Sequence, residues 1–109
     1  MEPADLPQPW SSRFSLAART VAVQARSLGL VAPGFRSPPA SPAAVRTMRR
    51  FADGRCIVAV RAAGRPHAEV IRDLVEGVIA ANGLSGAAAD HARSRLLDAV
   101  APVTGAQAA

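Results

Sequence analysis

Arginine is the side chain whose type and spacing offer chemistry in this chain. All thirteen positively charged residues are arginine, and six of them fall within residues 46–65, which hold a single acid. A guanidinium group stays protonated and donates paired hydrogen bonds to phosphate or carboxylate oxygens. Arginines at alternate positions of an extended chain share one face. The run VRTMRRFADGRCIVAVRA, residues 45–62, therefore predicts a surface for an anionic partner.

The distribution of charge along the chain is stronger evidence for an anionic partner than the net charge is. Residues 66–109 carry three arginines and five acids, so the positive charge is concentrated in the middle of the chain. Such an asymmetric field steers acidic proteins or nucleic acid. The formal net charge of +5 is weaker support. A composition rich in Ala, Gly, Pro and Arg, with no lysine, is what a GC-rich genome produces.

The residues that usually carry catalysis or bind metal are few. Two histidines, His67 and His91, and one cysteine, Cys56, form no spacing typical of a zinc site. There is no glycine-rich phosphate-binding loop and no nucleophile elbow. The sequence therefore predicts a protein that is not an enzyme and that uses no metal, no cofactor and no small-molecule substrate.

The element that must position the arginines is a predicted β-hairpin with Asp53 and Gly54 at its tip. Asp-Gly between two alternating runs is typical of a two-residue type I′ turn. This turn would pair Phe51 with Cys56 and Arg50 with Ile57. One face is then a core face, holding Val45, Thr47, Arg49, Phe51, Cys56, Val58, Val60 and Ala62. The other face holds Arg46, Met48, Arg50, Ala52, Arg55, Ile57, Ala59 and Arg61.

A helix over residues 42–53 is the alternative to the first strand. Ser41 and Pro42 suit a helix start, and Gly54 suits a helix end. The hairpin register also places Arg46 opposite Arg61, and like charges directly across strands destabilise a sheet. However, the apolar run at residues 56–60 reads as a strand in either case, and a strand needs a partner. We therefore favour the hairpin.

The remaining pattern is helical. Apolar residues at helical spacing predict helices over residues 12–30, 66–82 and 86–100, with Pro102 as a stop. Residues 31–44 are a Pro- and Gly-rich connection, and Gly77 inside the second helix indicates close backbone approach to a neighbouring helix or strand. We expect a disordered lead-in over residues 1–11, one domain over residues 12–101 and a disordered tail over residues 102–109.

The fold class predicted from these elements is α+β, in the order helix, β-hairpin, helix, helix, with the helices packed on one face of the hairpin. A two-stranded hairpin needs such a cover because it is marginally stable alone. Its open edges could also pair with a second copy. A homodimer with a shared sheet is therefore a hypothesis.

Two functional hypotheses follow from the hairpin. In the first, Arg46, Arg50, Arg55 and Arg61 bind the phosphates of nucleic acid, or an acidic protein, without sequence specificity. In the second, the protein is an interaction or regulatory subunit. Its partner would then cover a patch consisting of Met48, Ile57, Arg36, Pro38 and Pro39.

The cellular setting expected from the sequence is the cytoplasm. One cysteine cannot form a disulfide framework within the chain. No apolar run approaches the length of a membrane-spanning helix, so no membrane partner is expected. The acidic, Pro-rich start, MEPADLPQPW, does not fit a signal peptide.

Four segments carry a resemblance to other proteins. PGFRSPP (33–39), RTMRR (46–50), IVAVR (57–61) and GRPHAEVIRDLVEGVIAANGL (64–84) together resemble a group of short proteins from high-GC actinobacteria. That group has no assigned activity, so the resemblance implies only a bacterial cytoplasmic setting. Separately, IVAVRAAGRPHAEVI is similar to the strand–GRP–strand element of Phd/YefM-type antitoxins. The helical pattern after Pro66 departs from that element, and no antitoxin residue is carried over.

Overall fold

The computed structural model describes residues 8–37, 45–62 and 64–108. Its three strands follow one another in the chain between one helix and two further helices, so the predicted α+β class and the order of helix, hairpin, helix and helix are confirmed. The elements are α1 (Gln8–Ser27), β1 (Gly34–Arg36), β2 (Arg46–Arg50), β3 (Cys56–Val60), α2 (His67–Ala81) and α3 (Gly86–Ala108).

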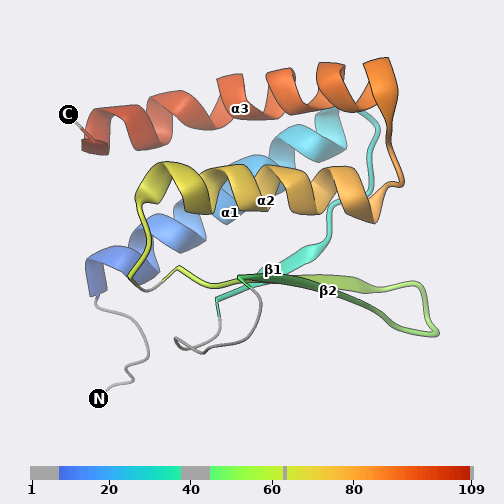
Figure 1. The fold of residues 1–109 in the computed structure, drawn as a ribbon, viewed down its shortest axis with the longest axis horizontal. Helices are drawn as coiled ribbons and strands as arrows, with labels where there is room; N and C mark the ends of the chain where they lie inside the picture. The colour runs from blue at the N-terminus through green and yellow to red at the C-terminus, as the bar shows by residue number, and fades with distance from the viewer. Residues whose placement is uncertain (1–7, 38–44, 63, 109) are drawn as a thin grey trace.

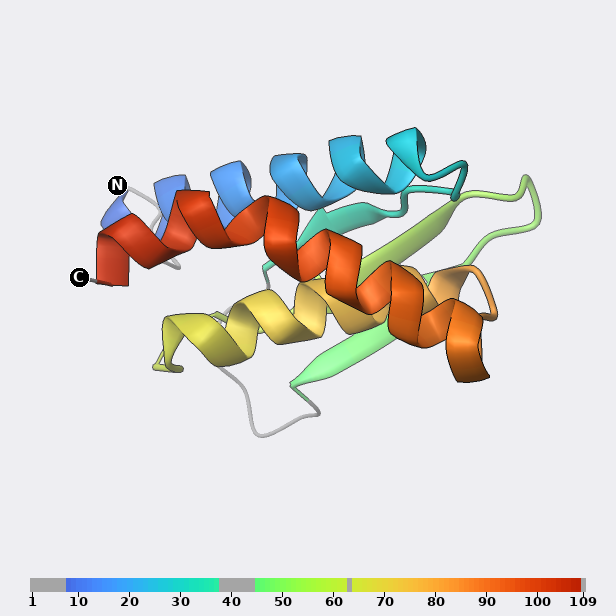
Figure 2. The same ribbon diagram turned by 90° about the horizontal axis from the view of Figure 1, so that it is seen from above.

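The elements form three layers (Figure 1). The sheet is one outer layer, α1 and α2 lie side by side above it, and α3 packs on both of these helices on the side away from the sheet (Figures 1 and 2). Of the three helices, α2 makes the most extensive contact with the strands. All the helices therefore lie on one face of the sheet, as predicted.

The core is built by β3 and the apolar stripes of the three helices. On β3, Cys56, Val58 and Val60 are buried, and they alternate with the half-buried Ile57 and Ala59. This period of two is the pattern of a strand with one covered face. The side chains with no exposure at all are Ala17, Val21, Ala25, Val58, Val60, Ala62, Val70, Leu74, Val75, Val78 and Leu96.

The predicted close approach at Gly77 is confirmed, and its partner is β3. A Cβ atom added at Gly77 would lie 2.7 Å from Cγ1 of Val58. Real Cβ atoms essentially never come so close to another heavy atom. The missing side chain at Gly77 is therefore what allows α2 to lie directly on the central strand.

The hairpin is present, so the alternative helix over residues 42–53 is wrong, but its turn differs from the prediction. The Phe51 N–H donates to the Arg55 carbonyl (2.9 Å), and the Gly54 N–H donates to the Phe51 carbonyl (3.0 Å). The loop is therefore residues 52–54, three residues instead of two. Gly54 has a positive φ of 89°, whereas no described residue other than glycine has one. This is the three-residue loop in which only the last residue is left-handed.

The three-residue loop shifts the pairing by one residue from the predicted register. Met48 pairs with Val58, where the prediction paired it with Ala59, and Arg50 pairs with Cys56. A slip of one residue moves every side chain of a strand to the opposite face. The predicted face of four arginines is therefore wrong, because β2 presents Arg46 and Arg50 on the helix side. The predicted clash of Arg46 with Arg61 also disappears, since Arg46 pairs with Val60.

A third strand lies within the segment predicted as a connection. β1 pairs in parallel with β3, and Phe35 is aligned with Val58. The strand order is β1-β3-β2, so β3 is central. Phe35 is half-buried and packs against the core. A strand of three residues that follows Pro33 and begins with a glycine is too short to show an alternation in the sequence.

Two helices extend beyond their predicted limits. α1 begins at Gln8, four residues before the predicted start at residue 12. α3 continues to Ala108, and the predicted stop at Pro102 is wrong. A proline inside a helix removes one N–H donor and bends the axis, but it does not prevent the backbone from continuing.

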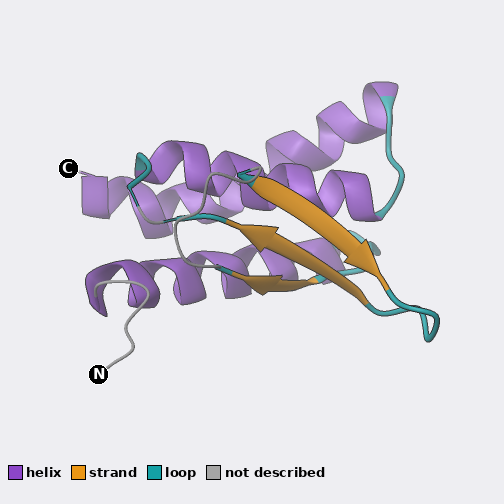
Figure 3. Ribbon diagram, turned by 60° about the horizontal axis from the view of Figure 1, so that its bottom comes forward, coloured by secondary structure: helices purple, strands orange, loops and turns teal. Residues whose placement is uncertain are grey.

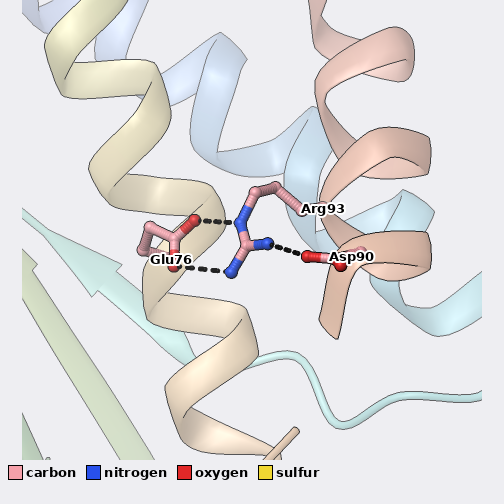
Figure 4. Close-up of polar contacts among 3 residues, drawn as sticks. All are labelled: Glu76, Asp90 and Arg93. Atoms are coloured by element: carbon pink, nitrogen blue, oxygen red, sulfur yellow. Dashed lines mark hydrogen bonds and ion pairs between the residues drawn. The ribbon is translucent and has the colours of Figure 1, made fainter. Parts of the chain in front are cut away.

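Ion pairs tie the helices to each other. The Arg93 guanidinium of α3 donates to both carboxylate oxygens of Glu76 on α2 and to Asp90 one turn earlier (Figure 4). The hydrogen bond to Glu76 is the largest cause of a raised pKa at Arg93. At the start of α2, Arg65 donates to Asp73 at 2.6 Å, and only 11% of the Arg65 side chain is exposed.

Candidate nucleic-acid interface

The face of the sheet that points away from the helices is the candidate interface, and we call it the open face. Figure 3 shows the three strands with the helical layers behind them and no helix on the near side. The pairing registers place Gly34, Thr47, Ile57 and Ala59 along the middle of this face. Small and β-branched residues form its floor, so longer side chains around the floor determine what it can bind.

Two of the four predicted site arginines lie on the open face. Arg55 and Arg61 flank β3 at odd-numbered positions, on the same face as Ile57, because side chains alternate along a strand. They are six residues apart, which is about 20 Å of extended chain. The Arg55 side chain is 65% exposed, and Arg61 is half-buried.

The other two predicted arginines lie on the helix side of β2. Arg50 donates to the Ala81 carbonyl at 2.7 Å and to the Ala80 carbonyl at 3.4 Å. These carbonyls belong to the last turn of α2, where a cation is favourable because the helix dipole ends negative. Arg50 is therefore a capping residue of α2. Arg46 is exposed, opposite Val60.

The fold brings two further arginines to the open face, of which the sequence analysis assigned Arg36 to the second patch and Arg49 to the core face. Arg36 on β1 is aligned with Ala59, and Arg49 on β2 pairs with Ile57. Both are exposed, and neither pairs with a carboxylate among the described residues. A signal for Arg49 existed, because the three-residue Ala-Asp-Gly loop gives its register directly. For Arg36 the sequence held no comparable signal of β1, the strand that aligns it with Ala59.

Phe51 was predicted for the core, but it stands between two arginines at the hairpin end of the open face. The guanidinium carbon of Arg55 lies 4.7 Å from the centre of the Phe51 ring, and that of Arg49 lies 5.5 Å away. Both distances are within the range of a cation–π interaction. An aromatic ring and guanidinium planes side by side are surfaces on which a nucleobase can stack.

Asp53 is the one carboxylate at the hairpin tip. Its Oδ2 accepts from Arg55 Nε at 2.8 Å, and its Oδ1 accepts from the Arg55 backbone N–H at 3.0 Å. The carboxylate thus holds the turn and aims the Arg55 side chain. Because Asp53 is 59% exposed, a tip inserted between phosphates would meet repulsion. The open face, by contrast, presents arginines.

The second predicted patch is not one surface in the described residues. Met48 pairs with Val58 and therefore lies on the helix side of the sheet, whereas Ile57 lies on the open face. Arg36 shares the open face with Ile57. Pro38 and Pro39 lie outside the described residues.

Other kinds of site find little support in the described part of the chain. It contains no group of three or more His, Cys, Asp or Glu residues that could hold a metal ion. Within the same ranges, no helix is both long enough and apolar enough to cross a membrane. No protein-family model, no curated protein and no solved structure matches this chain. The open face is therefore the part of the described structure whose geometry points to a function.

Proposed function

We propose that the protein is a non-catalytic module that binds single-stranded nucleic acid on the open face of its sheet. The observation that carries the proposal is Phe51 between Arg49 and Arg55 on a face that none of the described helices covers. The arginines bind phosphates, which supplies affinity that does not depend on sequence. Phe51 offers a stacking surface, which duplex bases cannot reach.

The electrostatic arrangement favours this face over the surfaces of α2 and α3. Arg65, just before α2, binds Asp73, and Arg93 of α3 binds Glu76, so these charges are paired. Arg36 and Arg49 keep their charge on the open face, which attracts a polyanion. α1 also carries the exposed Arg19 and Arg26 without an acid, and the open face differs from it by the Phe51 ring beside its arginines.

The preference for a single strand comes from the shape of the site. Reading a duplex in its major groove requires a helix or a projecting two-stranded ribbon. The hairpin is such a ribbon, but its tip carries the exposed Asp53 carboxylate. A strand laid across the open face instead meets Arg61, the small floor residues and then Phe51. Every base has a π face, so such binding tolerates many sequences.

The test is fluorescence anisotropy with a labelled oligonucleotide of about 12 nucleotides, single-stranded or in a duplex, over a series of salt concentrations. The variant R49A/R55A should weaken single-strand binding and make the salt slope shallower by about 1.4, because each phosphate contact contributes about 0.7 for single strands. The matched control is R72A/R95A, which removes two exposed arginines of the helical layers.

Phe51→Leu distinguishes the contribution of base stacking to the affinity from that of the arginine charges. It should weaken binding to the single strand by about tenfold, a typical loss for one stacked base, while the salt slope stays the same. Absence of binding at about 50 mM salt would refute the proposal, since counterion release is then at its strongest. Equal weakening by R49A/R55A and R72A/R95A would show that the open face is not the site.

A further inference from the structure

β2 is an edge strand whose outward backbone groups can be assigned. It ends the strand order β1-β3-β2, and all five of its residues are exposed. The Phe51 N–H donates to the Arg55 carbonyl, and the Arg61 N–H donates to the Val45 carbonyl. In an antiparallel pair, residues that exchange hydrogen bonds alternate with residues that do not. The backbone N–H and C=O groups of Thr47 and Arg49 therefore point toward β3.

It follows that Arg46, Met48 and Arg50 direct their N–H and C=O groups to the outer edge. No described strand pairs with that edge. Three residues with both groups outward offer a template for one more strand. Met48 is 42% exposed in the middle of this edge, so an apolar contact is available beside the backbone groups.

The charge of β2 determines what kind of strand fits. Three of its five residues are arginine and none is acidic. A second copy of β2 would add three more arginines to the same edge and no carboxylate. Like charges across strands destabilise, and opposite charges stabilise. Pairing of β2 with a second copy of β2 is therefore unfavourable, whereas pairing with an acidic segment is favourable.

We propose that the β2 edge binds an extended acidic segment of a partner protein by strand addition. Antiparallel pairing is slightly more stable per residue than parallel pairing. Acidic residues lie opposite Arg50, Arg49 and Arg46, an apolar residue opposite Met48 and a β-former opposite Thr47. Read along the partner, this pattern is acid, acid, apolar, neutral, acid. Strand addition uses the outward backbone groups of Arg46, Met48 and Arg50, which nucleic-acid binding on the open face does not use, and Arg49 is the one side chain that both proposals employ.

The test is an anisotropy titration of the full-length protein with the labelled peptide Thr-Glu-Glu-Val-Thr-Glu-Thr. We expect saturable binding, which Met48→Pro weakens by about tenfold or more through loss of a central hydrogen bond. Proline is tolerated on an edge strand where its missing N–H faces outward. The matched control, Met48→Ala, keeps the N–H and removes most of the side chain, so it should lose less than Met48→Pro.

Changes in the peptide keep the test valid if Met48→Pro does not fold. N-methylation of the peptide valine removes an N–H that would donate to the Met48 carbonyl, and it should abolish binding. N-methylation of the next residue, threonine, alters an N–H that points away from β2, and it should cost little. Equal effects of the two methylations would overturn strand addition.

Two further outcomes would overturn the assigned partner. If a peptide with glutamine in place of every glutamate binds equally well, the acidic residues do not determine which partner binds to β2. If light scattering finds a dimer that Met48→Pro converts to a monomer, the edge belongs to a second copy of this chain. Retention of a monomeric mass together with loss of peptide binding in Met48→Pro supports the proposal.

Discussion

Gly77→Ala is the substitution whose outcome depends most directly on the packing of α2 against β3. In a helix interior, alanine is more favourable than glycine by about 1 kcal/mol. The new methyl group would lie 2.7 Å from Cγ1 of Val58 and 3.4 Å from its Cβ and Cγ2 atoms. Val58 has no exposed surface and lies on the central strand between β1 and β2, so it cannot retreat.

The clash should outweigh the gain in helix propensity. Extra methyl groups in a packed core cost about 1–3 kcal/mol. Gly77→Ala should therefore lower the free energy of unfolding by about 1 kcal/mol, within a range of roughly 0–2 kcal/mol. For a domain of this size, that corresponds to a fall of roughly 4–8 °C in the melting temperature.

Urea unfolding followed by far-UV circular dichroism measures the change, and a double-mutant cycle identifies its cause. Val58→Ala alone should cost about 2 kcal/mol through the cavity that it leaves. In the double variant the two alanines fit together, so we expect a favourable coupling of about 2 kcal/mol. Arg72→Ala compared with Arg72→Gly, at an exposed position of the same helix, measures the propensity difference alone.

Two results would refute this reasoning. Gly77→Ala could be more stable than the wild type by the full difference measured at Arg72, or the cycle with Val58→Ala could show no coupling. Either result would mean that α2 does not lie on β3 at the distance described. The m-value should stay constant, because the surface exposed on unfolding is unchanged.

Two other predictions concern polar contacts that hold α2. Arg50→Ala removes the guanidinium from the Ala81 carbonyl and should cost about 1 kcal/mol in urea unfolding, whereas Arg46→Ala should change stability by less than about 0.5 kcal/mol. Equal effects would show that Arg50 does not cap the helix. Asn82 exchanges hydrogen bonds with the Val31 backbone, N–H to Oδ1 and Nδ2 to C=O, both at 2.9 Å, so Asn82→Ala should cost about 2 kcal/mol. Asn82→Asp keeps only the acceptor and should remain destabilised; wild-type stability in Asn82→Asp would count against the donor role.

The sequence was sufficient wherever a signal is local. The apolar stripe after Pro66 predicted α2 nearly residue for residue, and Gly77 indicated a close neighbour. The Asp53-Gly54 pair located the hairpin. These signals are short-range, since helical period and turn residues depend on the backbone preferences of a few adjacent residues.

The candidate site was only half predictable, because its composition depends on register. A two-residue and a three-residue loop around Gly54 differ by a single residue, yet they place opposite sets of β2 side chains on the open face. Arg55 and Arg61 kept their predicted face because β3 was assigned from its own alternation. Arg46 and Arg50 did not, because their face depended on the turn.

The sequence determined which segments are helices, where the chain reverses and where positive charge gathers. Only the tertiary structure decided which arginines share a surface. β1 exists because β3 offers it a parallel edge, and that pairing brings Arg36 beside Ala59, more than twenty residues along the chain. Strand pairing is a long-range interaction whose hydrogen bonds leave little trace in a short segment such as Gly34–Arg36. An anionic partner could therefore be proposed from the distribution of arginine along the chain, but the face proposed to bind it could not.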